Sequence, residues 1–209
     1  MEYKLHKLSE LNEGQINHAT AICVEGLYNI FSIISKDNAV LEELFKDSFD
    51  YGMNYACLHN EEVVGFIGLG DASRRATGKM KQETFERLFD KHKSKMMYRA
   101  MSSAFTKPKN YSNNEVEVEF FVTASHFRGK GVGTWIIHYL CANFPYEFCV
   151  LDVYSKNLEA KRFYERLGFE QVKIKSDWML RLRGIGKTIT MQLDMKDQLI
   201  RSSSKTCQS

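Results

Sequence analysis

Apolar and polar residues alternate along this chain with two different periods, which divide it into short strands and amphipathic helices. A period of two, bounded by polar turns, predicts strands at Tyr3–Leu8, Met53–His59, Val63–Leu69, Glu115–Thr123, Phe148–Tyr154, Phe169–Ile174 and Lys187–Met195. Apolar residues three or four apart predict helices at Ala19–Ile34, Ala39–Phe49, Phe85–Ala104, Thr134–Phe144 and Ala160–Leu167. This order of elements predicts an α/β fold with one mixed central sheet flanked by helices.

A glycine-rich loop lies between one predicted strand and the helix that follows it. Arg128-Gly129-Lys130-Gly131-Val132-Gly133 comes after Glu115–Thr123 and before Thr134–Phe144. Closely spaced glycines let backbone N–H groups approach an anion, and the start of the helix adds roughly half a positive charge. Arg128 and Lys130 contribute two cations at the same place. The loop therefore predicts a binding site for a pyrophosphate.

Two common nucleotide-binding motifs do not fit this loop. A Walker A motif ends in Gly-Lys followed by Ser or Thr, whereas Lys130 is followed by Gly131. The dinucleotide fingerprint needs glycines at its first, third and sixth places, and the sixth place counted from Gly129 is Thr134. Both interpretations are therefore set aside.

The pattern Arg-Gly-x-Gly-x-Gly after a strand is joined by a second motif downstream, Asn157-Leu158-Glu159-Ala160-Lys161-Arg162-Phe163-Tyr164-Glu165-Arg166-Leu167-Gly168-Phe169. Two such motifs in this order resemble the GCN5-related N-acetyltransferases (GNAT). The resemblance covers essentially the whole chain apart from an insertion and the tail. It implies an acyl-CoA N-acyltransferase fold in a single domain over residues 1–196, a helical insertion at about 72–114, and a flexible tail at 197–209.

The resemblance also implies acetyl-CoA as co-substrate and assigns a set of residues to it. In the family, the first motif binds the pyrophosphate, the strand before it offers backbone groups to the pantetheine, and the second motif flanks the pantetheine and the sulfur. The residues in these places are Phe121, Val122, Thr123, Arg128, Gly129, Lys130, Gly131, Val132, Gly133, Thr134, Asn157 and Tyr164. Asn157 also fits a plain helix N-cap, and Tyr164 also fits the apolar stripe of its helix.

Transfer of an acetyl group from a thioester to an amine needs a base and benefits from an acid. An amine with a pKa of about 10.4 is nucleophilic in only about one molecule in 2,500 at pH 7, so a base must remove its proton. Glu117 and Glu119 are our candidates, because they share one face of the strand Glu115–Thr123 and the family often carries a carboxylate there. The alternative for either is a solvated strand face. The resemblance makes Tyr164 the candidate acid for the leaving thiolate.

The segment 72–114 is longer than the short connection that the family pattern normally allows. Its predicted helix, Phe85–Ala104, is rich in Lys and Arg on the face opposite its apolar stripe. This basic face is most simply a solvated surface, and the alternative is a role in admitting an anionic acceptor.

Composition restricts the classes of function. A net charge of +3 over 209 residues is too small to predict nucleic-acid binding, and no stretch is long and apolar enough for a membrane span or a signal peptide. The five cysteines form no CxxC pair and the histidines no ligand spacing, so neither a disulfide framework nor a metal is expected. These features predict a cytoplasmic protein. We also expect it to be a monomer or a homodimer.

The sequence therefore predicts an N-acetyltransferase that moves an acetyl group from acetyl-CoA to a small-molecule or peptide amine. An acyltransferase with another acyl donor or a protein acceptor stays open, and so does a non-catalytic acyl-CoA sensor. The acceptor pocket is expected to be built from the first two predicted helices, the strands Met53–His59 and Val63–Leu69, the inserted helix and the segment around residues 178–183. In that segment Trp178, Arg181 and Arg183 could line the pocket or could pack a strand edge.

Overall fold

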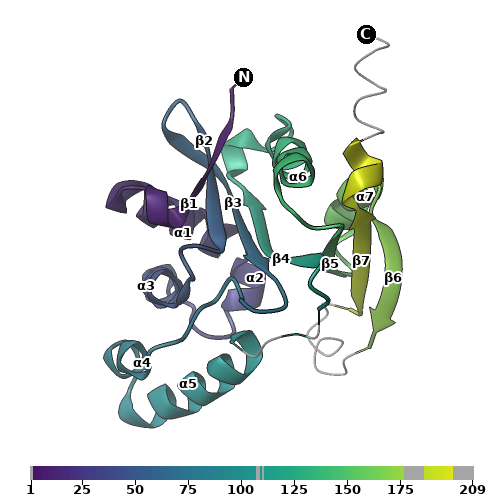
Figure 1. Ribbon diagram of the computed structural model, residues 1–209. Coiled ribbons are helices and arrows are strands. Elements are labelled where there is room, and N and C mark those ends of the chain that lie inside the picture. The colour runs from purple at the N-terminus through teal and green to yellow at the C-terminus, as the bar shows by residue number, and fades with distance from the viewer. Residues whose placement is uncertain (1, 107–108, 110, 177–185, 200–209) are drawn as a thin grey trace. The chain divides into compact units, whose positions relative to one another are not determined.

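The computed structural model describes residues 2–106, 109, 111–176 and 186–199. Seven strands form one mixed sheet with the order β1-β2-β3-β4-β5-β7-β6 (Figure 1). The strands are β1 Lys4–Lys7, β2 Asn54–His59, β3 Glu62–Gly70, β4 Glu115–Thr123, β5 Phe148–Tyr154, β6 Glu170–Lys175 and β7 Thr188–Asp194. The predicted α/β class with a mixed sheet and flanking helices is confirmed.

The chain divides into two compact units that share β4. The first unit contains Met1–Asn110 and Phe120–Ile136, and the second contains Tyr111–Glu119 and Ile137–Ser209. The single domain expected over 1–196, and the tail expected after it, stay predictions.

Antiparallel strands β1, β2 and β3 form the sheet of the first unit together with the end of β4. β1 pairs with β2 from Lys4 opposite Leu58, and the N–H of Ala124, just after β4, donates to the carbonyl of Val64 in β3 at 3.0 Å. The strands predicted at Met53–His59 and Val63–Leu69 form a hairpin, β2 and β3, with a turn of two residues, Asn60 and Glu61, both in the left-handed region. Such a turn matches the twist of the two strands.

The long helix predicted over Ala19–Ile34 is two helices, α1 Glu13–Gly26 and α2 Tyr28–Phe31. The helix ends because Leu27, with φ −109° and ψ 15°, leaves the helical region. Gly26 lets this end of α1 approach β4 closely, since a Cβ there would lie 2.2 Å from Val122 Cγ1. α3, Asn38–Ser48, corresponds to the predicted helix Ala39–Phe49.

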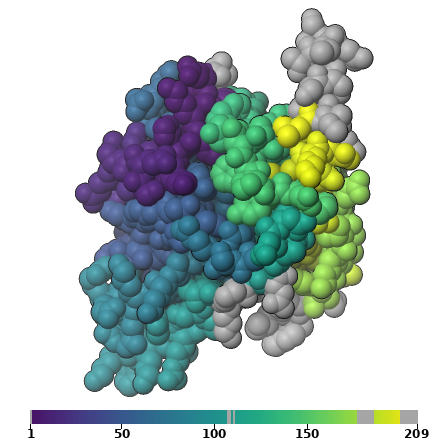
Figure 2. Space-filling view, viewed as in Figure 1, coloured from purple at the N-terminus to yellow at the C-terminus, as the bar shows by residue number. Residues whose placement is uncertain are grey.

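The inserted segment also contains two helices where one was predicted. α4, Gln82–Leu88, and α5, Lys91–Phe105, lie together on the side of α3 (Figure 1) and are exposed on the surface (Figure 2). Asp90 separates them, because its carboxylate accepts hydrogen bonds from the N–H groups of His92 and Lys93 and begins a new helix. The insertion is anchored in the core by the buried Phe85 and Met101.

Parallel strands β4 and β5 begin the second unit. Glu115 to Val118 pair with Phe148 to Leu151, and α6, Val132–Asn143, precedes β5 in the chain. β7 pairs with β5 along its whole length, and β6 pairs with the other side of β7. Residues 195–199 continue as a helical turn in which the buried Gln198 hydrogen-bonds His138 at 3.1 Å.

Candidate functional site

The glycine-rich loop begins at Arg128, directly after a short 3-10 turn, Ser125–Phe127, and leads into α6 at Val132. Gly129 and Gly131 have φ of +75° and +85°, a conformation that glycine adopts without strain. A Cβ built on either glycine meets no atom within 4 Å. The loop is therefore open on the side where a larger residue would project its side chain.

The loop and the first turn of α6 present hydrogen-bond donors. The N–H groups of Gly129, Gly131, Gly133 and Thr134 donate to no backbone carbonyl among the described residues, whereas the N–H of Trp135 already donates to Gly131. The first N–H groups of a helix have no partner inside it and attract an anion. Arg128 and Lys130 are exposed beside them. These residues fit a pyrophosphate such as the one in coenzyme A.

Two further features support the loop and were not predicted from the sequence. Gly65 in β3 admits the start of α6, because a Cβ there would lie 3.2 Å from both Val132 Cγ1 and Ile136 Cδ1. Phe127 is buried before the loop, and the Lys130 ammonium lies 4.7 Å from its ring centroid. A glycine inside a predicted strand is the signal that could have indicated the first feature.

The strand segment assigned to the pantetheine, Phe121 to Thr123, lies beyond the residues of β4 that pair with β5. Val122 is buried, and Phe121 and Thr123 are partly exposed. This segment and the glycine loop both belong to the first unit. The structure thus brings together two of the three groups of residues that the sequence assigns to the cofactor.

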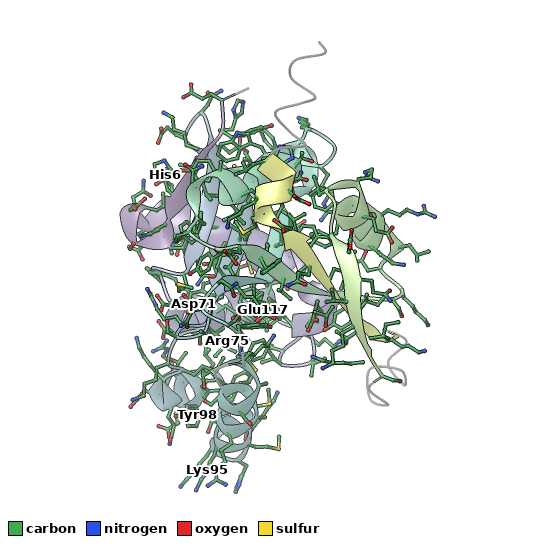
Figure 3. The ribbon with its side chains drawn as sticks, turned by 45° about the vertical axis from the view of Figure 1, so that its right-hand side comes forward. His6, Asp71, Arg75, Lys95, Tyr98 and Glu117 are labelled. Carbon is green, nitrogen blue, oxygen red and sulfur yellow. The ribbon has the colours of Figure 1, made fainter. Side chains whose placement is uncertain are left out.

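The two candidate bases differ in burial. Glu117, labelled in Figure 3, lies on β4. It is 2% exposed, whereas Glu119 is partly exposed, and the Oε2 atoms of both carboxylates are buried. A solvated strand face is therefore the wrong interpretation for Glu117. Both residues belong to the second unit, as do Asn157 and Tyr164.

Tyr164 lies on α7, Leu158–Arg166, and Asn157 directly precedes this helix, both in the second unit. The predicted N-cap is confirmed, because Asn157 Oδ1 accepts a hydrogen bond from the N–H of Ala160 at 3.1 Å. Tyr164 packs edge-on against Phe163 and Phe169, with ring centroids 5.2 and 5.3 Å apart, and is 8% exposed. Burial raises the pKa of Tyr164 well above its usual value, which makes the hydroxyl a weaker acid than a free tyrosine.

The loop after β3 is fixed by side chains and contains a buried arginine. Asp71 accepts hydrogen bonds from the N–H groups of Ser73 and Arg74, and Asn54 donates to the carbonyls of Asp50 and Ala76. Arg75, also labelled in Figure 3, belongs to this loop and is buried. The sequence offered no signal for its burial, because Arg is mostly exposed in proteins.

Other expected features are only partly within the described structure. Trp178, Arg181 and Arg183 lie outside the described residues. Among the residues that the structure describes, no three His, Cys, Asp or Glu side chains gather in a way that could hold a metal ion. No helix in the same part of the chain is long and apolar enough to cross a membrane.

Comparison with known proteins places the chain in a family. The family model of the acetyltransferase (GNAT) family matches residues 24–169. The chain belongs to this GNAT family. No curated protein matches its sequence. The matched residues of this GNAT protein include β4, the glycine-rich loop and α7.

Solved structures of low sequence identity share the GNAT fold. A chimera of the spermidine N-acetyltransferase SpeG from Vibrio cholerae and hSSAT is 14% identical with a TM-score of 0.59, over 95% of this chain and 99% of that one. An N-acetyltransferase from Staphylococcus aureus Mu50 is 12% identical with a TM-score of 0.57, over 91% and 100%. A ribosomal-protein alanine N-acetyltransferase from Escherichia coli is 13% identical with a TM-score of 0.51, over 93% and 94%.

Proposed function

We propose that this GNAT protein transfers the acetyl group of acetyl-CoA to the amine of a small molecule or peptide by direct attack, with both substrates bound. The observation that carries the proposal is the open loop at Gly129 and Gly131, whose N–H groups and neighbouring cations suit a pyrophosphate. When bound, acetyl-CoA supplies an activated thioester. Phe121, Val122 and Thr123 would offer backbone groups to its pantetheine, and Asn157 a side-chain amide.

The base in this proposal is a glutamate of β4. Glu117 is favoured over Glu119, because a carboxylate shielded from water interacts more strongly with the ammonium from which it takes the proton. Such a carboxylate draws the proton from the acceptor amine directly or through a water molecule. Removal of this proton makes the amine a nucleophile at neutral pH.

Tyr164 is the proposed acid. A tyrosine is protonated at neutral pH, so the Tyr164 hydroxyl can donate a hydrogen bond to the thiolate as it leaves. Burial, which raises the pKa of Tyr164, makes complete transfer of the proton to the thiolate less favourable. A core tyrosine without a chemical role is the alternative, and its contacts with Phe163 and Phe169 are compatible with both roles.

The acceptor is proposed only as an amine. Two structural neighbours carry acceptor names in their titles, spermidine in one and a ribosomal protein in the other. Their identities of 14% and 13% support a shared fold and leave the acceptor class open. A panel of acceptors should therefore contain polyamines, amino acids and short peptides with a free α-amino group.

A thiol-release assay with this panel tests the proposal. The four described cysteines, Cys23, Cys57, Cys141 and Cys149, are buried free thiols, and burial raises the pKa of Cys57 to about 12 and that of Cys141 to about 11. They should react slowly with a thiol reagent. Cys207 lies outside the described residues, so a Cys207→Ser variant removes it from the background.

We expect release of coenzyme A that depends on the acceptor and produces an equal amount of acetylated amine. Binding of acetyl-CoA without release under any acceptor would instead identify an acyl-CoA sensor. Release with a longer acyl-CoA at a higher kcat/KM than with acetyl-CoA would identify a different donor.

A further inference from the structure

Tyr3 connects the beginning of the chain with the glycine-rich loop. Its hydroxyl donates a hydrogen bond to the carbonyl of Lys130 at 3.1 Å. Its ring lies near His59 and Trp135, with centroid distances of 5.5 and 5.7 Å. His59 belongs to β2 and Trp135 to α6, so the Tyr3 ring contacts both elements while its hydroxyl bonds to the loop.

This contact fixes the orientation of one peptide group. The carbonyl of Lys130 and the N–H of Gly131 belong to the same peptide unit, which is trans, so they point in opposite directions. With the carbonyl turned toward Tyr3, the N–H of Gly131 is turned away from it. This N–H is one of the loop donors that make no backbone hydrogen bond among the described residues.

Without this contact the orientation of the peptide group would be less restricted. Gly131 has φ of +85°, and glycine occupies negative φ about as readily, so the N–H can turn in the other direction at little cost. Two further contacts hold the preceding residue: the N–H of Lys130 donates to the carbonyl of Phe127 at 3.3 Å, and the Lys130 ammonium lies over the Phe127 ring. Among the residues that the structure describes, the Tyr3 hydroxyl is the contact that acts on the carbonyl.

We infer that Tyr3 is a positioning residue for the pyrophosphate: its hydroxyl holds the Lys130–Gly131 peptide with the N–H of Gly131 facing the anion. The inference rests on the proposed function, because it assumes that the loop binds coenzyme A. Tyr3 contacts the loop proposed to bind the pyrophosphate, so we expect its effect on donor binding and not on the chemical step.

Calorimetric titration with coenzyme A tests the inference in the full-length wild type and in Tyr3→Phe, which removes the hydroxyl and keeps the ring. We expect the Kd to rise about fivefold, which corresponds to the ~1 kcal/mol of one neutral hydrogen bond. Tyr28→Phe is the matched control, because the Tyr28 hydroxyl donates to the carbonyl of Lys36, also at 3.1 Å but outside the loop. We expect Tyr28→Phe to bind coenzyme A like the wild type.

Kinetics with two donors separate positioning from a general loss of structure. With an amine that is acetylated, Tyr3→Phe should raise the KM for acetyl-CoA and leave kcat unchanged. S-acetylpantetheine lacks the pyrophosphate, so its kcat/KM should be the same in both proteins. An unchanged Kd for coenzyme A in Tyr3→Phe overturns the inference, and so does an equal loss with both donors. Failure of the wild type to bind coenzyme A overturns the proposed function itself.

Discussion

Burial distinguishes the two glutamates that are candidates for the base. Glu117 and Glu119 are two residues apart on β4, yet only Glu117 is almost fully buried. We expect Glu117→Gln to lower kcat about 100-fold, the lower end of the usual contribution of a general base, because the amide keeps the shape and loses the proton acceptor. Initial rates at saturating substrates measure this effect.

Glu119→Gln is the matched control for this substitution and should change kcat by less than about threefold, since the proposal gives this residue no proton to transfer. A larger loss in Glu119→Gln than in Glu117→Gln would transfer the role of base to Glu119. Thermal unfolding of both variants shows whether a loss of rate is only a loss of folded protein.

The hydroxyl of Tyr164 can be tested in the same way. Tyr164→Phe keeps the ring contacts with Phe163 and Phe169 and removes the proton. We expect kcat to fall about 100-fold while the Kd for acetyl-CoA stays nearly the same. Single-turnover rates and calorimetry measure the two quantities, and an unaltered rate would leave Tyr164 with a packing role alone.

Sequence alone predicted those residues whose role depends on local geometry. The glycines of the loop and the N-cap at Asn157 follow from spacing and from chain conformation, and both the positive φ angles and the cap are present. The burial of Glu117 and the contact of Tyr3 with Lys130 depend on partners far away in the chain. No local pattern contains that information.

Asn157 has two proposed roles that substitution can separate. Its Oδ1 caps α7, and its Nδ2 is the donor proposed for the pantetheine. Asn157→Asp keeps an oxygen for the cap and loses the donor, so it should weaken acetyl-CoA binding without lowering the melting temperature. Asn157→Ala loses both groups and should also destabilise the protein by about 1 kcal/mol. Equal affinity in all three proteins would leave only the capping role.

The first inserted helix, α4, is joined to α3 by two carboxylates of α3, Asp47 and Glu43. Asp47 Oδ2 accepts hydrogen bonds from Thr84 Oγ1 at 2.7 Å and from Arg87 at 3.2 Å, and Arg87 also pairs with Glu43. Burial acts to raise the pKa of Asp47, but the hydrogen bonds from Thr84 and Arg87 outweigh it and lower the pKa. A lowered pKa means that folding favours the charged carboxylate.

We therefore expect Asp47→Asn to destabilise the protein by roughly 1 kcal/mol at pH 7. The stabilisation by Asp47 is present above its ordinary pKa of 3.8 and is lost as the pH falls through its lower value in the folded protein. The difference between variant and wild type should therefore shrink toward pH 2. Urea unfolding at both pH values measures it, and a difference independent of pH would contradict the role of the charge.

Helix boundaries were less predictable than strand boundaries. The predicted bounds of β4 and β5 agree with the structure, because alternation ends abruptly where a strand meets a turn. The two long predicted helices are each divided, at Leu27 and at Phe89-Asp90. Apolar spacing continues across both breaks, so the pattern alone does not reveal them. Asp90 is the more predictable of the two, since Asp is a common N-cap.

The class of the whole fold followed from the order of its elements and from two motifs, and it is confirmed by the strand order and by the family match. Sequence order did not predict the position of β7 between β5 and β6. The sequence does not predict the class of acceptor, because the acceptor pocket depends on side chains from several segments that match no substrate class.

Binding of coenzyme A by the loop is the claim on which the account depends, and calorimetric titration of Gly131→Ala tests it most directly. Gly168→Ala is the matched control, because Gly168 after α7 has a similar φ of +90° and pays a similar strain of roughly 1–2 kcal/mol. We predict that Gly168→Ala binds coenzyme A like the wild type and that folded Gly131→Ala binds it at least tenfold more weakly, a difference of about 1.4 kcal/mol. Unchanged affinity in Gly131→Ala would contradict the account.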